Sequence, residues 1–214
     1  MNYKALIYDF DGVICDSVDV KTEAFAQIYK KYGPDVVKNV KEYHIKNGGI
    51  SRFKKFKYFH LNYLGLKLSN NQLISLGNTF SNLVKKKVIE SPFINGVQDF
   101  ISINSRTFLQ FICTGTPENE ILEIAKKKNI STYFNEIYGS PKSKEEIISL
   151  IKKKYNLSSD EIVFFGDAMT DYNSSKKCNV SFIGVENNLN SFPKNTFLIN
   201  DFLDDSLKKI LKIN

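Results

Sequence analysis

Six short apolar runs, separated by segments with helical spacing, constrain the fold of this chain most. They lie at residues 5–8, 108–113, 137–138, 162–165, 182–183 and 197–199. The second run is preceded by the helical face of Val97, Phe100 and Ile101. Strands that are apolar on both sides and alternate with helices are typical of a parallel sheet covered on both faces. The pattern therefore predicts an α/β fold.

Residues 17–90 follow a different pattern. Apolar side chains recur at i, i+3, i+4 and i+7, as in Phe25, Ile28, Tyr29 and Tyr32, and no convincing strand interrupts them. We expect an all-helical insertion of about 70 residues after the first strand. The expected domains are an α/β core at 1–16 and 91–214 and a helical cap at 17–90.

The composition excludes some classes of partner. The net charge of +7 is compatible with nucleic-acid binding, but the lysine triplets fall near expected helix ends, where cations oppose the helix dipole. No apolar run is long enough to cross a membrane. Three widely spaced cysteines and a start without signal-peptide features favour the cytoplasm. We expect no nucleic-acid or membrane partner, and a monomer or weak homodimer.

Polar residues capable of catalysis follow four of the expected strands. Asp9 and Asp11 follow the first strand, and two carboxylates this close are costly unless a positive group lies between them. Thr114 and Gly115 follow the second, where we expect Thr116 to cap a helix. Because ligands bind at the carboxyl ends of parallel strands, these residues predict one site.

The third and fourth strands add a cation and two further carboxylates. Ser143 fits a capping box that would put Lys144 at the first helical position, where a cation is unfavourable unless it has another role. Lys142 is an alternative, so the choice between the two lysines stays open. Gly166-Asp167 ends the fourth strand, and Asp171 follows four residues later.

These motifs, in this order, resemble the four motifs of the haloacid dehalogenase superfamily, and the resemblance covers the whole chain. The helical insertion resembles the C1 cap of its phosphoglycolate-phosphatase-like branch. The resemblance implies a Rossmann-like parallel sheet and a phosphatase that forms an aspartyl-phosphate. Asp9 would be the nucleophile and Asp11 the general acid and base. Thr114, the Gly115 amide and Lys144 would hold the phosphoryl oxygens.

The resemblance also implies a Mg²⁺ cofactor. Its ligands would be the carboxylates of Asp9 and Asp167 and the main-chain carbonyl of Asp11, which suit the preference of Mg²⁺ for oxygen. Asp171 would orient Lys144 or a metal-bound water.

Other functions within the superfamily fit less well. Dehalogenases and phosphonatases lack the second aspartate, which is Asp11 here. Phosphosugar mutases keep it but usually carry a histidine twelve residues after the nucleophile, where this chain has Lys21. A catalytically silent binding protein would be expected to have lost one or more of the four motifs, all of which are intact in this chain.

The expected substrate is a small phosphorylated metabolite, such as phosphoglycolate or a sugar phosphate. Arg52, after the glycine pair at 48–49, is a candidate for gripping a second anionic or hydroxylated group, or a solvated arginine at a helix start. His60 lies on an apolar stripe and is interpreted as a structural residue.

Overall fold

A six-stranded parallel sheet forms the centre of the protein, in the order β3-β2-β1-β4-β5-β6. The computed structural model describes residues 2–187 and 192–212. The strands are β1 (Ala5–Tyr8), β2 (Leu109–Pro117), β3 (Glu136–Ser140), β4 (Ile162–Gly166), β5 (Ser181–Val185) and β6 (Phe197–Ile199). Each of the six apolar runs contributes to one strand, which confirms the predicted α/β fold.

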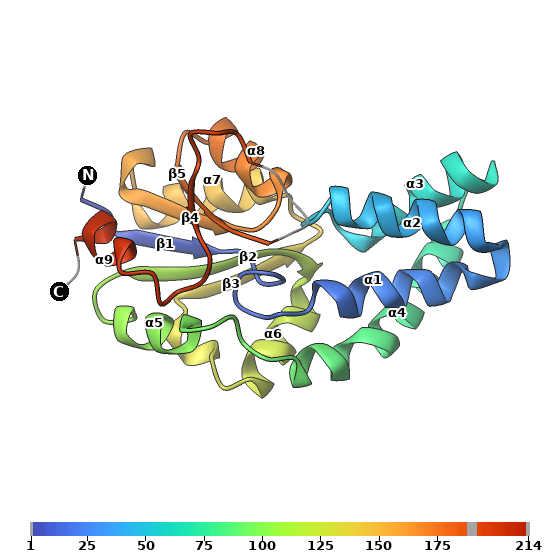
Figure 1. Cartoon of the computed structure of the whole chain (residues 1–214), viewed down its shortest axis with the longest axis horizontal. Helices are drawn as coiled ribbons and strands as arrows, with labels where there is room; N and C mark the ends of the chain where they lie inside the picture. Colours follow the sequence, from blue (N-terminus) through green and yellow to red (C-terminus); the bar gives the residue numbers. More distant parts are fainter. Residues whose placement is uncertain (1, 188–191, 213–214) are drawn as a thin grey trace.

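Helices cover both faces of the sheet (Figure 1). They are α5 (Val97–Asn104), α6 (Glu118–Lys127), α7 (Lys144–Tyr155), α8 (Met169–Lys177) and α9 (Ser206–Leu211). Successive side chains of β1 point to opposite faces of the sheet. Leu6 and Tyr8 pack in the hydrophobic cluster that contains residues of α5, α6 and α9. Ala5 and Ile7 pack on the other face, with residues of α7. Because both faces of the sheet are buried, the sequence of β1 is a continuous apolar run.

Four helices extend from the carboxyl-end edge of the sheet (Figure 1). They are α1 (Val18–Tyr29), α2 (Pro34–Lys46), α3 (Arg52–Leu64) and α4 (Asn70–Glu90), and residues 17–90 contain no strand. An aromatic cluster that includes Phe25, Phe56, Phe59 and Phe80 holds them together. We propose that they form the expected cap domain at 17–90, and we call them the cap.

Short 3₁₀ helices and caps complete the chain. The 3₁₀ helices span Lys30–Tyr32, Ser131–Tyr133 and Ser159–Glu161. The Ser143–Glu146 capping box is present and makes Lys144 the first residue of α7, as predicted. The predicted start of α6 was wrong by one residue: β2 extends through Pro117, which takes the N-cap position. Within the described ranges, no helix combines the length and apolar character needed to span a membrane.

Candidate active site

The site lies where β1, β2, β3 and β4 end beneath the cap. The residues that sequence analysis selected at these strand ends come together here: Asp9, Asp11, Thr114, Gly115, Lys144, Asp167 and Asp171. Gly12 turns the chain away from β1 with a φ of +81°. A Cβ at this position would lie 2.3 Å from Asp167 Oδ2, so glycine lets the two strand ends approach.

Lys144 connects two of the carboxylates. Its Nζ lies 2.6 Å from Asp9 Oδ2 and also pairs with Asp171 Oδ1, and all three side chains are at most 6% exposed. Burial opposes the charge of Lys144, but Asp171 and Asp9 outweigh it and raise the pKa of the ammonium. Lys142 instead lies at the surface, 3.2 Å from Glu118 Oε2.

Three buried carboxylates form a cluster suited to a cation. One oxygen each from Asp9, Asp167 and Asp171 lies within 4.8 Å of the others. Burial, together with the charges of Asp171 and Asp9, raises the pKa of Asp167 well above its usual range. The Asn187 amide donates to Asp167 Oδ2 at 3.0 Å. Oxygen donors and surplus negative charge match the chemistry of Mg²⁺, so these residues fit the metal.

Asp11 lies in a separate hydrogen-bonding network. Ser17 Oγ donates to its Oδ1 at 2.6 Å, and Lys21 pairs with its Oδ2. Lys21 also donates to Thr116 Oγ1 at 2.7 Å, so Thr116, expected to cap α6, serves this network instead. Burial opposes ionisation of Asp11, but Lys21 and Ser17 lower its pKa overall.

The loop between α2 and α3 closes over Thr114 and Gly115. A Cβ on Gly115 would lie 2.3 Å from the Gly49 carbonyl oxygen, so only glycine permits this approach of cap and sheet. Thr170 Oγ1 donates to the Gly48 carbonyl oxygen across the same boundary. Thr114 is 2% exposed and lines the space between cap and sheet.

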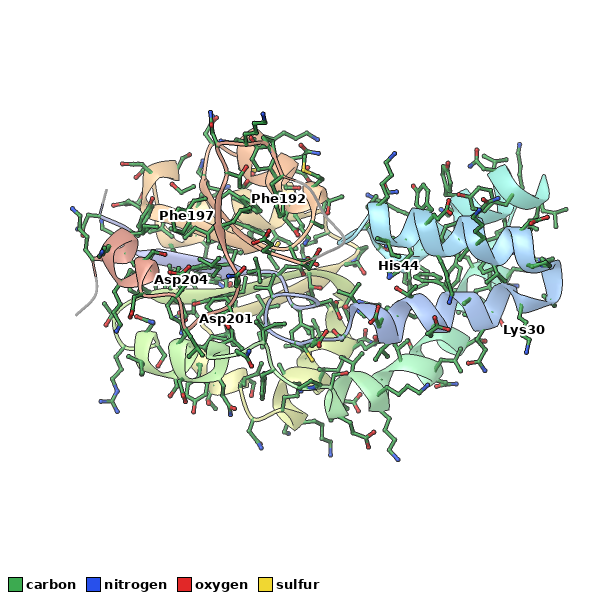
Figure 2. The ribbon with its side chains drawn as sticks, in the orientation of Figure 1. Lys30, His44, Phe192, Phe197, Asp201 and Asp204 are labelled. Carbon is green, nitrogen blue, oxygen red and sulfur yellow. The ribbon has the colours of Figure 1, made fainter. Side chains whose placement is uncertain are left out.

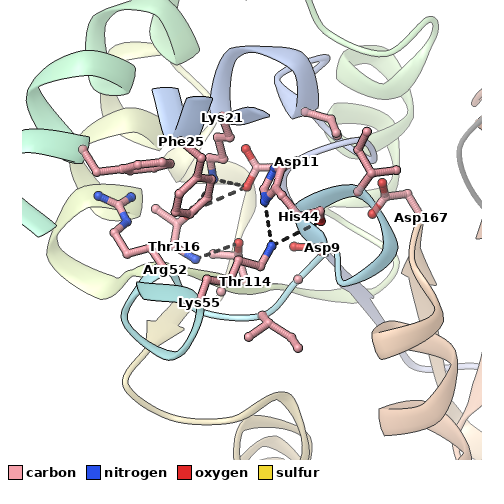
Figure 3. A pocket seen from close by; sticks show the side chains of 17 residues that line it. Asp9, Asp11, Lys21, Phe25, His44, Arg52, Lys55, Thr114, Thr116 and Asp167 are labelled. Atoms are coloured by element: carbon pink, nitrogen blue, oxygen red, sulfur yellow. Dashed lines mark hydrogen bonds and ion pairs between the residues drawn. The ribbon is translucent and has the colours of Figure 1, made fainter. Parts of the chain in front are cut away.

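Cap and sheet together line a cavity of about 60 Å³ (Figure 3). Carboxylates of the sheet lie on one side of it, whereas the cap contributes the cations Lys21, Arg52 and Lys55. Arg52 pairs with both oxygens of Glu120 on α6, at 2.5 and 3.0 Å, and donates to Ser81 Oγ at 2.7 Å. The candidate substrate residue Arg52 thus already has an anionic partner in the protein.

Residues 6–185 match the family described as haloacid dehalogenase-like hydrolase. The chain belongs to this family. A curated relative from Thermotoga maritima, "Phosphorylated carbohydrates phosphatase", is 24% identical over 198 residues, which cover 87% of each chain. These findings confirm the family that the motifs predicted and make the protein a hydrolase.

Solved structures share the fold of this haloacid dehalogenase-like hydrolase. A β-phosphoglucomutase from Clostridium difficile superimposes with a TM-score of 0.80 at 20% identity, over 98% of this chain and 96% of that one. The HAD-hydrolase YfnB from Bacillus subtilis, bound to magnesium, gives a TM-score of 0.72 at 16% identity over the full length of both.

Sequence reasoning missed several residues of the site in this haloacid dehalogenase-like hydrolase. They are Lys21, His44, Lys55, Thr116 and Glu120. Arg52 and Lys55 are three residues apart and share a helix face, which is the signal that could have grouped them. His60 is 6% exposed, with Nδ1 2.7 Å from the Tyr29 hydroxyl, so it packs inside the cap.

Proposed function

We propose that this hydrolase is a magnesium-dependent phosphatase that cleaves a small phosphorylated metabolite through an aspartyl-phosphate. The observation that carries the proposal is Asp9, a buried carboxylate at the end of the central strand. It lines the cavity between cap and sheet and contacts Lys144. The phosphatase name of the Thermotoga maritima relative supports the same reaction.

Asp9 and Asp11 have different roles: Asp9 attacks phosphorus, and Asp11 transfers protons. Asp9 attacks phosphorus and displaces the alkoxide, forming a covalent phosphoryl group that a water then hydrolyses. The negative charge of a bound phosphate opposes the effect of Lys21 and favours the protonated form of Asp11. Asp11 then donates this proton to the leaving oxygen and accepts one from the attacking water. Asp11 and Asp9 both line the cavity, so both can reach one substrate.

The phosphoryl oxygens need donors that strengthen their contacts in the transition state. Lys144, Thr114 and the Gly115 amide lie at the ends of β2 and β3 and supply a charge, a hydroxyl and a main-chain donor. The pairing with Asp171 holds the Lys144 ammonium at the site.

The proposed metal ligands are the carboxylates of Asp9 and Asp167 and the Asp11 carbonyl. The oxygen cluster and the raised pKa of Asp167 support a cation here. When bound, Mg²⁺ would offset the repulsion between the Asp9 carboxylate and the phosphate. The magnesium bound to YfnB, a structure with the same fold, is consistent with this assignment.

Phosphate release from a panel of phosphorylated metabolites tests the function. We expect release from at least one sugar phosphate or hydroxy-acid phosphate with Mg²⁺, loss of the activity with EDTA, and recovery on adding excess Mg²⁺. A phosphosugar mutase, the alternative that the shared fold of the β-phosphoglucomutase keeps open, would instead transfer the phosphoryl group between hydroxyls of one sugar. Isomerised sugar phosphate without free phosphate would contradict the phosphatase proposal.

A further inference from the structure

A buried ammonium in the cap has no carboxylate partner in the described part of the chain. Lys55 on α3 is 2% exposed, and its hydrogen-bond partner among the described residues is His44, at 2.7 Å from Nδ1 and 3.4 Å from the carbonyl oxygen. Its Nζ also lies over the Phe25 ring, 5.9 Å from the ring centroid, which does not neutralise the charge. The other two cap cations of the cavity are neutralised, Lys21 by Asp11 and Arg52 by Glu120. A buried charge without a counter-ion is costly, so Lys55 requires an explanation.

His44 holds Lys55 in place without neutralising it. An ammonium has donors only, so Nδ1 of His44 accepts the hydrogen bond and the ring is neutral there. Burial, then the charge of Lys55, lowers the pKa of His44, which keeps the ring an acceptor. His44 lies at the end of α2 nearest the sheet, whereas Lys30 lies at the far end of the cap (Figure 2).

The pair lies beside the proposed reaction site. Lys55 and His44 line the same cavity as Asp9 and Asp11, and approach it from the cap (Figure 3). Burial, and then Lys21, lowers the pKa of Lys55 to about 7. An anion brought into the cavity would counter both effects and favour the charged lysine.

We propose that Lys55, positioned by His44, binds a second anionic group on the leaving group of the substrate. This inference rests on the proposed phosphatase function and narrows its substrate class. The substrate is then a small phosphomonoester whose alcohol carries a carboxylate or another phosphate. Lys144 and the metal ligands serve the phosphoryl group that is transferred, and Lys55 serves the group that leaves.

Matched substrates test the proposal on the unaltered enzyme. The series is 2-hydroxyethyl phosphate, which is neutral at its far end, 2-phosphoglycolate, which carries a carboxylate there, and ethane-1,2-diyl bisphosphate. We expect kcat/KM for at least one doubly anionic substrate to exceed that of the neutral one by about tenfold or more. Comparing kcat/KM for 2-phosphoglycolate with that for the bisphosphate shows whether the second anionic group is a carboxylate or a phosphate. A preference below threefold for both would overturn the proposal.

Substitutions then assign the preference to Lys55. Lys55→Met keeps the aliphatic bulk and should bring the preference for the doubly anionic substrates to within about threefold, because the lost charge weakens their binding most. Lys57→Met, an exposed lysine on the same helix, is the control and should keep the preference. Melting curves establish that both variants fold.

The outcomes separate this proposal from the proposed function. Equal losses for all three substrates in Lys55→Met would place Lys55 with the transferred phosphoryl group and overturn the second-anion site. An unchanged preference in Lys55→Met would also overturn it. Both results leave the phosphatase function standing. If the unaltered enzyme with Mg²⁺ hydrolysed none of the series or of the wider panel, both proposals would fail.

Discussion

Lys144 shows how a single side chain balances the charges at the phosphoryl end of the cavity. It carries one positive charge against Asp9 and Asp171, and Asp167 adds a further carboxylate nearby. If all three carboxyls were ionised, Asp9, Asp167 and Asp171 would leave a surplus of negative charge over Lys144, and burial together with this surplus raises the pKa of Asp167. A metal ion would offset this surplus, and a phosphate group could then approach Asp9.

Replacing the two candidate lysines separately tests the assignment of the phosphoryl contact. Lys144→Met should lower kcat/KM by about 10² to 10³, because it removes a charge-assisted contact that strengthens in the transition state. Lys142→Met, at the surface beside Glu118, is the matched control and should stay within about threefold. Steady-state kinetics on one substrate measure both. A silent Lys144→Met beside a damaging Lys142→Met would reverse the assignment.

The residues at strand ends could be predicted because their position follows from the strands themselves. Once the run 162–165 is taken as a parallel strand, Asp167 must lie at the same edge as Asp9. The contacts of Lys21, Lys55 and Glu120 could not be predicted in this way. They depend on how the cap helices rotate about their axes and dock on the sheet, which the packing of the aromatic cluster decides.

At the scale of the element, α3 places two different cations on one face. Arg52 and Lys55 are three residues apart and both line the cavity, whereas Phe56 and Phe59 face the aromatic cluster of the cap. Arg52 also ties α3 to Glu120 on α6. The helix therefore connects the cap to the core through Arg52 and carries Lys55, which we propose binds the substrate.

Lys55, which has no carboxylate partner among the described residues, should lower the free energy of unfolding of the ligand-free protein. The size of this effect should depend on pH. Burial, and then the charge of Lys21, lowers the pKa of Lys55 in the folded protein to about 7, below its ordinary value of 10.5. Between these values the unfolded chain binds a proton that the folded chain lacks, so stability rises with pH across this window. The groups acting on Lys55 here are Lys21, which lowers its pKa, and the more distant Asp9, Asp11 and Asp167, which raise it; His44 accepts its hydrogen bond.

Lys55→Met removes this penalty. Its free energy of unfolding should exceed that of the parent by about 1–3 kcal/mol at pH 7, after allowing for the lost His44 hydrogen bond, and the difference should shrink by pH 9.5. Urea unfolding at the two pH values measures it, with Lys57→Met as a control that changes little. A less stable Lys55→Met with a pH-independent difference would mean that the ammonium is well solvated or paired.

At the scale of the whole molecule, the cap and the sheet meet at glycines. Gly115 lies near the carboxyl end of β2 and packs against the Gly49 carbonyl. Thr170 Oγ1 donates a hydrogen bond to the Gly48 carbonyl oxygen. These contacts hold the loop between α2 and α3 against the carboxyl ends of the strands, beside the cavity that Asp9 lines.

Gly115→Ala should hinder closure while keeping the main-chain amide. Its Cβ would lie 2.3 Å from the Gly49 carbonyl oxygen, so the loop must move away. We expect kcat/KM to fall about tenfold or more with a change in unfolding free energy under about 1 kcal/mol. Enzyme kinetics and urea unfolding test this. Full activity in Gly115→Ala would show that close contact at this point is unnecessary.

The central claim is that Asp9 carries the phosphoryl group during turnover. Acid quenching of the enzyme within the first turnover, followed by mass spectrometry of its peptides, tests this most directly. We expect one added phosphoryl group on Asp9 and none on any peptide of Asp9→Asn, which should also lose turnover. A phosphoryl group on another residue, or turnover by Asp9→Asn within about tenfold of the parent, would contradict it.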